Sequence, residues 1–124
     1  MEIKFRAWNG FKMIYKFFIS AEGQIFLDKN PRGVDMSNVT GIYPPNYNYY
    51  TIMQFTGIHD CEGKEIYEKD VCEFDNEIWQ IEYGGDGSYY ILSETRMIPL
   101  HEIASDEIKK IGNRFENPEL LKGE

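Results

Sequence analysis

Hydrophobic and polar residues alternate with a period of two along the first part of the chain, from Ile3 to Phe17. Alternation of this kind is typical of β-strands that bury one face. The dipeptide Asn9-Gly10 interrupts the pattern in its middle, and this dipeptide is common in the turns of β-hairpins. The segment therefore predicts an N-terminal β-hairpin.

Two registers of this hairpin fit the pattern. A two-residue loop, Asn9-Gly10, would place lysine side chains on the apolar face. A three-residue loop, with Gly10 in the left-handed conformation as a G1 bulge, pairs Ala7 with Phe11 and separates charged from apolar positions. We prefer this second register for that reason. It predicts an apolar face of Ile3, Phe5, Ala7, Phe11, Met13, Tyr15 and Phe17, and an opposite basic stripe of Lys4, Arg6, Lys12 and Lys16.

Two further strands are expected before the middle of the chain. Gln24 to Asp28 predicts a short one, and Tyr49 to Thr56 predicts another that ends at Gly57. Between them, Lys29 to Asn48 is rich in Pro and Gly and predicts an irregular segment. A loop of this length in a small domain is often functional or mobile.

Residues 60 to 92 predict a compact β-meander, because short apolar stretches alternate with turn residues. Its side chains Trp79, Ile81 and Tyr83 are expected to point inward. The expected strands are Val71 to Asp75, Ile78 to Tyr83 and Tyr89 to Leu92, and the expected turns are Asp60-Cys61-Glu62-Gly63, Asn76-Glu77 and Gly84 to Ser88.

The tail predicts a helical turn at Ser105-Asp106-Glu107, a strand from Ile108 to Phe115, and a final helical turn capped by Asn117 with Pro118 next. The predicted fold class is mainly β, with small bent sheets or an SH3-like barrel meander, an N-terminal β-hairpin and a short C-terminal helical turn. We expect one compact domain over residues 1–124. Residues 1–58 would hold the hairpin, strands and long loop, and 59–124 the meander and tail.

Composition agrees with a single globular domain. The 124 residues are 42% hydrophobic, which is enough for a core without disulfides or metals. No apolar run could span a bilayer, and the opening residues lack a signal-peptide pattern, so we expect no membrane contact and a cytoplasmic location. In that compartment Cys61 and Cys72 would be reduced thiols.

The charge is distributed unevenly. The formal net charge is −8, but residues 1–20 carry four basic residues against Glu2, a balance of +3, and residues 60–86 carry ten carboxylates against Lys64 and Lys69. Four like charges on the hairpin could dock phosphates or an acidic partner. The acidic stretch repels nucleic acid and favours basic partners, although solubility alone also explains it.

No catalytic or metal-binding constellation is evident. His59-Asp60-Cys61 is best interpreted as a turn, because neighbouring side chains rarely have the geometry of an activated thiol. The scattered Cys and His residues lack the spacing of a zinc site, and Gly84 to Gly87 precedes a strand, not a phosphate-binding helix. We therefore expect no enzyme activity and no cofactor.

A cluster of tyrosines surrounds Pro44-Pro45 in the long irregular segment. These side chains could stack on bases or make protein contacts, and the acidic total favours protein. The cluster consists of Tyr43, Tyr47, Tyr49 and Tyr50.

Three stretches together resemble the YopX family of phage and prophage proteins. They are Ile3-Lys4-Phe5-Arg6-Ala7-Trp8; Met53-Gln54-Phe55-Thr56-Gly57-Ile58-His59-Asp60 with Gly63-Lys64-Glu65-Ile66-Tyr67-Glu68 and Asp70-Val71; and Ile111-Gly112-Asn113 with Phe115-Glu116-Asn117-Pro118-Glu119-Leu120-Leu121. The chain departs from the family pattern at Lys69, where Gly is usual, and at Cys61, where Lys is common.

The resemblance implies a β-dominated fold and a phage or prophage gene of a Gram-positive host, and thus the host bacterial cytoplasm. It implies no activity and carries over no catalytic residue. Our first hypothesis is a non-enzymatic protein-interaction module that forms a homo-oligomer and binds a phage or host protein. The alternative is a nucleic-acid-binding accessory protein that uses the basic hairpin. A third is an acidic mimic of DNA, which no motif supports.

Overall fold

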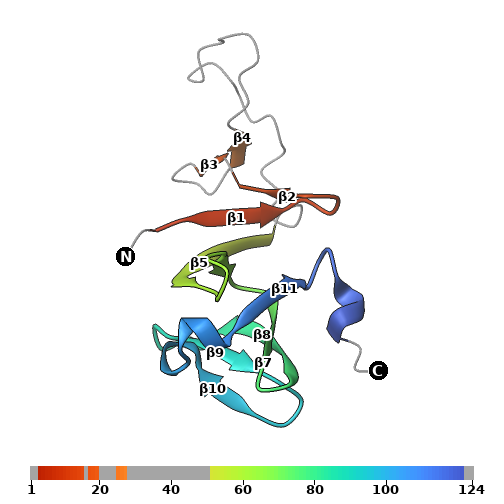
Figure 1. Cartoon of the computed structure of the whole chain (residues 1–124). Helices are drawn as coiled ribbons and strands as arrows, with labels where there is room; N and C mark the ends of the chain where they lie inside the picture. The colour runs from red at the N-terminus through yellow and green to blue at the C-terminus, as the bar shows by residue number, and fades with distance from the viewer. Residues whose placement is uncertain (1–2, 16, 20–24, 28–50, 122–124) are drawn as a thin grey trace. The chain divides into compact units, whose positions relative to one another are not determined.

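The computed structural model describes residues 3–15, 17–19, 25–27 and 51–121, and its fold is mainly β (Figure 1). This confirms the predicted fold class. In the described residues the only helical elements are short 3-10 turns. The chain forms two compact units, one of Arg6–Ile52 and one of Met1–Phe5 with Met53–Glu124.

The predicted N-terminal hairpin is present, but its register is not the one that we preferred. Strand β1 (Phe5–Trp8) pairs with β2 (Met13–Ile14), and Ala7 lies opposite Ile14. The connecting loop therefore has four residues, from Asn9 to Lys12. Gly10 has a φ of 100°, so the expected positive φ is found in a longer loop.

This register overturns the predicted apolar face of the hairpin. The partner of Ala7 is Ile14 instead of Phe11, a shift of three positions, and a shift by an odd number of residues turns every side chain of a strand to the other face. Phe11 lies in the loop instead of a strand and is 90% exposed, and Tyr15 is 53% exposed. Ile3 and Phe5 are also exposed, whereas Ala7 is fully buried.

The same unit contains a second antiparallel hairpin. Strand β3 (Phe17–Ile19) pairs with β4 (Ile25–Leu27), with Phe18 opposite Phe26. The strand expected between Gln24 and Asp28 is thus confirmed. The long segment from Lys29 to Asn48 lies outside the described residues.

Strand β5 (Thr51–His59) runs past the expected end at Gly57 and pairs with β6 (Glu65–Tyr67), which the sequence pattern did not predict. Gly57 has a φ of 88°, and the pairing register shifts between Phe55 and His59. Glycine therefore makes a β-bulge here, and the strand continues beyond it.

The unit of Met1–Phe5 with Met53–Glu124 also contains a five-stranded antiparallel sheet, which Figure 1 shows to be strongly curled. The connection from β7 to β8 is a two-residue turn in which Asp75 and Asn76 both have positive φ, which is one residue earlier than predicted. The sheet order is β10 (Met97–Pro99), β9 (Tyr89–Leu92), β8 (Glu77–Tyr83), β7 (Asp70–Phe74) and β11 (Lys109–Asn113).

Buried side chains of this sheet form much of the hydrophobic core. Trp79 and Ile81 are fully buried as predicted, but Tyr83 at the end of β8 is 49% exposed, so its inward assignment was wrong. The core cluster consists of Ile66, Cys72, Trp79, Ile81, Ile91, Leu100, Ile103 and Ile108.

Three 3-10 turns complete the described structure. They are η3 (Leu100–Glu102), η4 (Ser105–Glu107) and η5 (Pro118–Leu121). The last two were predicted as helical turns. The first covers the core with the buried side chain of Leu100.

Candidate functional site

The tip of the β1–β2 hairpin presents the most exposed aromatic side chain among the described residues, Phe11. Asn9 orders this loop because its Oδ1 atom accepts hydrogen bonds from the backbone N–H groups of Phe11 (2.8 Å) and Lys12 (2.9 Å). The Asn9 N–H donates to the carbonyl of Lys12 at 3.3 Å. We call residues 9–12 the hairpin tip.

The predicted basic stripe is not a continuous exposed surface. Lys4 donates a hydrogen bond to Glu65, and its side chain is only 35% exposed. Arg6 is fully buried, which corrects its placement on the surface. Lys12 is exposed at the hairpin tip, and Lys16 lies outside the described residues.

Tyr43, Tyr47, Tyr49 and Tyr50, the tyrosine cluster expected to make contacts, also lie outside the described residues. A different tyrosine, Tyr83, is exposed at the end of β8, beside the half-buried Tyr89. Tyr83 lies opposite Tyr89 in the β8–β9 pair, and their ring centroids are 5.3 Å apart at an angle of 60°. Tyr89 also packs partly on the core, which fixes its ring.

The loop beside these two rings is held by its own side chains. Asp86 accepts hydrogen bonds from the Tyr90 hydroxyl (2.8 Å) and from the N–H of Ser88 (3.1 Å), and the Tyr83 hydroxyl accepts one from Gly87 N–H (3.1 Å). The Tyr90 bond lowers the pKa of the Asp86 carboxyl, so this exposed group is ionised at neutral pH. We call Tyr83, Tyr89 and Asp86 the tyrosine patch.

Sequence reasoning missed this patch because alternation along β8 predicted Tyr83 inside. The turn residues Gly84-Gly85 mark the end of the strand directly after Tyr83. A side chain at a strand end can be exposed even on the core-facing side, because the strand runs past the core there.

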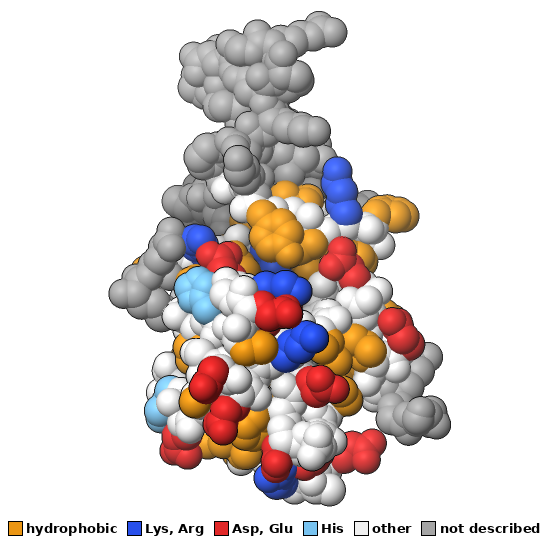
Figure 2. Space-filling view, in the orientation of Figure 1, with side chains coloured by type: hydrophobic (Ala, Val, Ile, Leu, Met, Phe, Trp, Pro, Cys, Tyr) orange, Lys and Arg blue, Asp and Glu red, His pale blue; other side chains and the backbone are white. Residues whose placement is uncertain are grey.

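Most acidic side chains of residues 60–86 either make ion pairs and hydrogen bonds within the fold or are exposed to solvent. On the face drawn in Figure 2, the red carboxylates are spread over the lower part of the view, with blue Lys and Arg side chains among them. Asp86, like the exposed Glu73, has no cation partner among the described residues, and it is the one of these two that lies beside the tyrosine rings. Described ion pairs join Lys4 to Glu65, Lys64 to Glu62, Lys69 to Glu82, Arg96 to Asp75 and Glu77, and Lys110 to Asp70.

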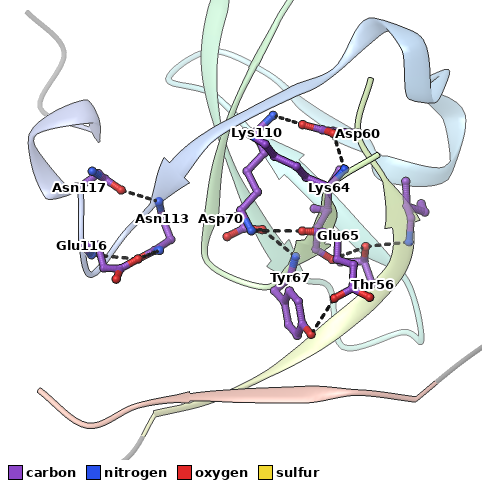
Figure 3. Close-up of polar contacts among 12 residues, drawn as sticks. Thr56, Asp60, Lys64, Glu65, Tyr67, Asp70, Lys110, Asn113, Glu116 and Asn117 are labelled. Carbon is purple, nitrogen blue, oxygen red and sulfur yellow. Dashed lines mark hydrogen bonds and ion pairs between the residues drawn. The ribbon is translucent and has the colours of Figure 1, made fainter. Parts of the chain in front are cut away.

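A buried polar network lies where β6, β7 and β11 meet (Figure 3). Lys110 on β11 places its Nζ atom 3.2 Å from the carboxylate of the fully buried Asp70 and 3.2 Å from the carbonyl oxygen of Glu65. Asp70 also accepts the N–H of Tyr67 at 2.8 Å. The bond from Lys4 lowers the pKa of the Glu65 carboxyl, so that group is an anion in the network.

Asp60 connects two distant segments of chain. Its carboxylate accepts backbone N–H groups of Glu62 (2.9 Å), Lys64 (2.8 Å) and Lys110 (2.8 Å). Burial opposes ionisation, but these bonds outweigh it and hold the pKa of the Asp60 carboxyl below its ordinary value. The Asp60 carboxylate thus stabilises a turn, as expected for His59-Asp60-Cys61.

The remaining candidate chemistry is structural too. Cys61 and Cys72 are free thiols, and burial raises the pKa of Cys72, which keeps that thiol protonated and unreactive. Within the ranges that the structure describes, no group of three or more His, Cys, Asp or Glu side chains could hold a metal ion. In those ranges no helix is long and apolar enough to cross a membrane.

The C-terminal segment is fixed by Asn113 and Asn117. The Asn113 N–H donates to Asn117 Oδ1 at 3.2 Å, and Asn113 Oδ1 accepts the N–H groups of Phe115 and Glu116. A Cβ atom on Gly112 would lie 2.4 Å from Asn117 Oδ1, so only glycine fits under this side chain.

The model of the YopX protein family matches residues 4–122. This chain belongs to the YopX family. The family that the three stretches resemble is thereby confirmed. Asp60, Asp70 and Asn113 lie in the stretches that resemble the family, and each makes hydrogen bonds that hold the fold together.

Two solved structures resemble the chain over nearly its whole length. Protein EF1440 from Enterococcus faecalis has 24% sequence identity and a TM-score of 0.62, with 98% of this chain and 99% of that chain covered. YopX from Bacillus subtilis has 21% identity and a TM-score of 0.63, with 98% and 97% covered. The sequence matches none of the curated proteins. These likenesses establish the YopX fold alone.

Proposed function

We propose that this YopX-family chain is a non-enzymatic accessory protein of a phage or prophage that associates with itself and contacts other proteins. The observation that carries the proposal is the hairpin tip, where Phe11 is 90% exposed. An exposed aromatic ring gains free energy when a partner removes it from water, and aromatic anchors dominate many protein interfaces. The tip thus offers a ready anchor for protein contact.

The order of the tip supports this role. Asn9 Oδ1 holds the N–H groups of Phe11 and Lys12, so the loop has a defined conformation in the free chain. A loop that is already ordered loses less conformational entropy when it binds.

Nucleic-acid binding has less support from the same hairpin. Lys4 is neutralised by Glu65, and Arg6 is buried, so Lys12 alone of the four predicted positions is a described, exposed cation. The net charge of −8 also opposes approach of a phosphate backbone. Protein contact is therefore the use that these side chains favour.

Sedimentation velocity over a concentration series tests the proposal. The full chain is expected to sediment as a species heavier than its 14.6 kDa. Phe11→Ser should shift this distribution toward the monomer, because it removes the exposed ring without disturbing a buried contact. Met97→Ser is the matched control, since Met97 is 63% exposed but lies on β10.

Loss of association in Phe11→Ser, with Met97→Ser unchanged, would support the role of the tip. A chain that stays monomeric at every concentration up to about 100 µM, far above the Kd of a typical specific complex, would overturn self-association.

A further inference from the structure

The tyrosine patch has an aromatic surface beside uncompensated negative charge. Tyr83 is 49% exposed, and its ring meets that of Tyr89 at 5.3 Å. Asp86 is ionised, and no cation pairs with it in the described parts of the chain. The negative charge of Glu68 also acts on Tyr89, whose pKa is raised by burial first and by Glu68 second.

Such a surface selects a partner with a cation next to an apolar or aromatic group. Tyrosine faces attract ammonium and guanidinium groups, and aromatic rings prefer edge-to-face or offset contacts with one another. Six of the ten carboxylates between Asp60 and Asp86 are ion-paired, whereas the exposed carboxylate of Asp86 keeps its negative charge beside the tyrosine rings and attracts a cation there.

The hairpin tip has the complementary chemistry. Phe11 is an exposed ring, and Lys12 is an exposed cation directly beside it in the sequence. Lys4 is paired with Glu65 and Arg6 is buried, so the positive charge that the tip presents is that of Lys12. The chain therefore carries two surfaces that are opposite in charge and similar in aromatic character.

We propose that the hairpin tip of one copy docks on the tyrosine patch of a second copy, with Phe11 against Tyr83 and Tyr89 and Lys12 beside Asp86. This inference rests on the proposed function and names the surfaces that self-association uses. The contact joins two different surfaces, so it is heterologous, and each copy has one of each to offer.

A mixing experiment with two full-length variants tests the contact. Phe11→Ser lacks the anchor but keeps the patch, and Tyr83→Ala lacks the patch but keeps the tip. Each variant alone is expected to associate at least about tenfold more weakly than the wild-type chain, as removal of an interface anchor predicts. An equimolar mixture should form a mixed complex, because the tip of one variant meets the patch of the other.

The mixed complex is detected by native mass spectrometry with one variant labelled with ¹⁵N, and circular dichroism checks that both variants fold. If Tyr83→Ala is misfolded, Asp86→Lys replaces it: alone it should associate more weakly than the wild-type chain, and mixing it with Phe11→Ser should form the mixed complex.

The outcomes separate this inference from the proposed function. Recovery in the mixture supports the tip-to-patch contact. If the wild-type chain associates but the patch variants associate equally well, and mixtures recover nothing, then the inference is wrong and self-association stands. A wild-type chain that remains monomeric removes both.

Discussion

The ammonium group of Lys110 lies 3.2 Å from the carboxylate of Asp70, a side chain with no exposure to solvent. The two residues come from β11 and β7, neighbouring strands at one side of the five-stranded sheet. Removal of one partner from a buried ion pair costs more than the pair contributes, because the other charge stays in a low-dielectric site.

Lys110→Met should therefore lower the free energy of unfolding by about 3 kcal/mol, in the range for broken buried pairs. Urea denaturation measures this change. Lys109→Met is the control, since Lys109 is exposed on the same strand and should change stability by less than about 0.5 kcal/mol. Equal effects of the two variants would contradict the role of the pair.

Asp60 should make stability depend on acid pH. Because its folded pKa lies below the unfolded value, near 3.9, its contribution is complete at neutral pH and falls as the pH drops from about 5 through the folded pKa. Urea titrations between pH 2.5 and 7 should show this fall in the wild-type chain and a smaller one in Asp60→Asn. Identical slopes would rule out Asp60 as a source.

A side chain at Gly112 should displace the Asn117 side chain and destabilise the fold. Gly112→Ala would put Cβ 2.4 Å from Asn117 Oδ1, the acceptor of the Asn113 N–H. A loss of about 2 kcal/mol is expected, as for other overpacked sites. In an Asn117→Ala background the same change should cost less, and thermal denaturation of the four proteins gives this coupling. Additive effects would argue against the contact.

The two cysteines should differ in reactivity. Cys61 is exposed and Cys72 is buried with a raised pKa, so a thiol reagent should label one site in the native chain and two in denaturant. Cys61→Ser should abolish native labelling. Rapid labelling of native Cys72 would mean that the core opens readily.

Local pattern predicted the sheet well where one face of a strand is buried. The strand Tyr89 to Leu92 has the bounds of β9, and Val71 to Asp75 differs from β7 by one residue at each end. Alternation and turn residues are local signals, and in this meander each strand pairs with the next one along the chain.

The sequence did not predict the hairpin register or the exposure of its charged residues, because both depend on side-chain contacts. The hairpin register depends on the Asn9 side chain, which binds Phe11 and Lys12 and lengthens the loop. The basic stripe failed at Lys4 because its partner, Glu65, is distant in sequence, so no local pattern could indicate the pair. The hairpin was predictable, but the exposure of Phe11 at its tip was not.

Photo-crosslinking from the hairpin tip tests directly whether the tip of one copy contacts the tyrosine patch of another. Phe11 is replaced by p-benzoylphenylalanine in the full-length chain, and the products are mapped by mass spectrometry after irradiation at several concentrations. A crosslinked species of twice the chain mass is expected, in which position 11 of one copy is joined to the segment from Tyr83 to Tyr89 of a second copy. Absence of any intermolecular crosslink at every concentration would contradict this contact.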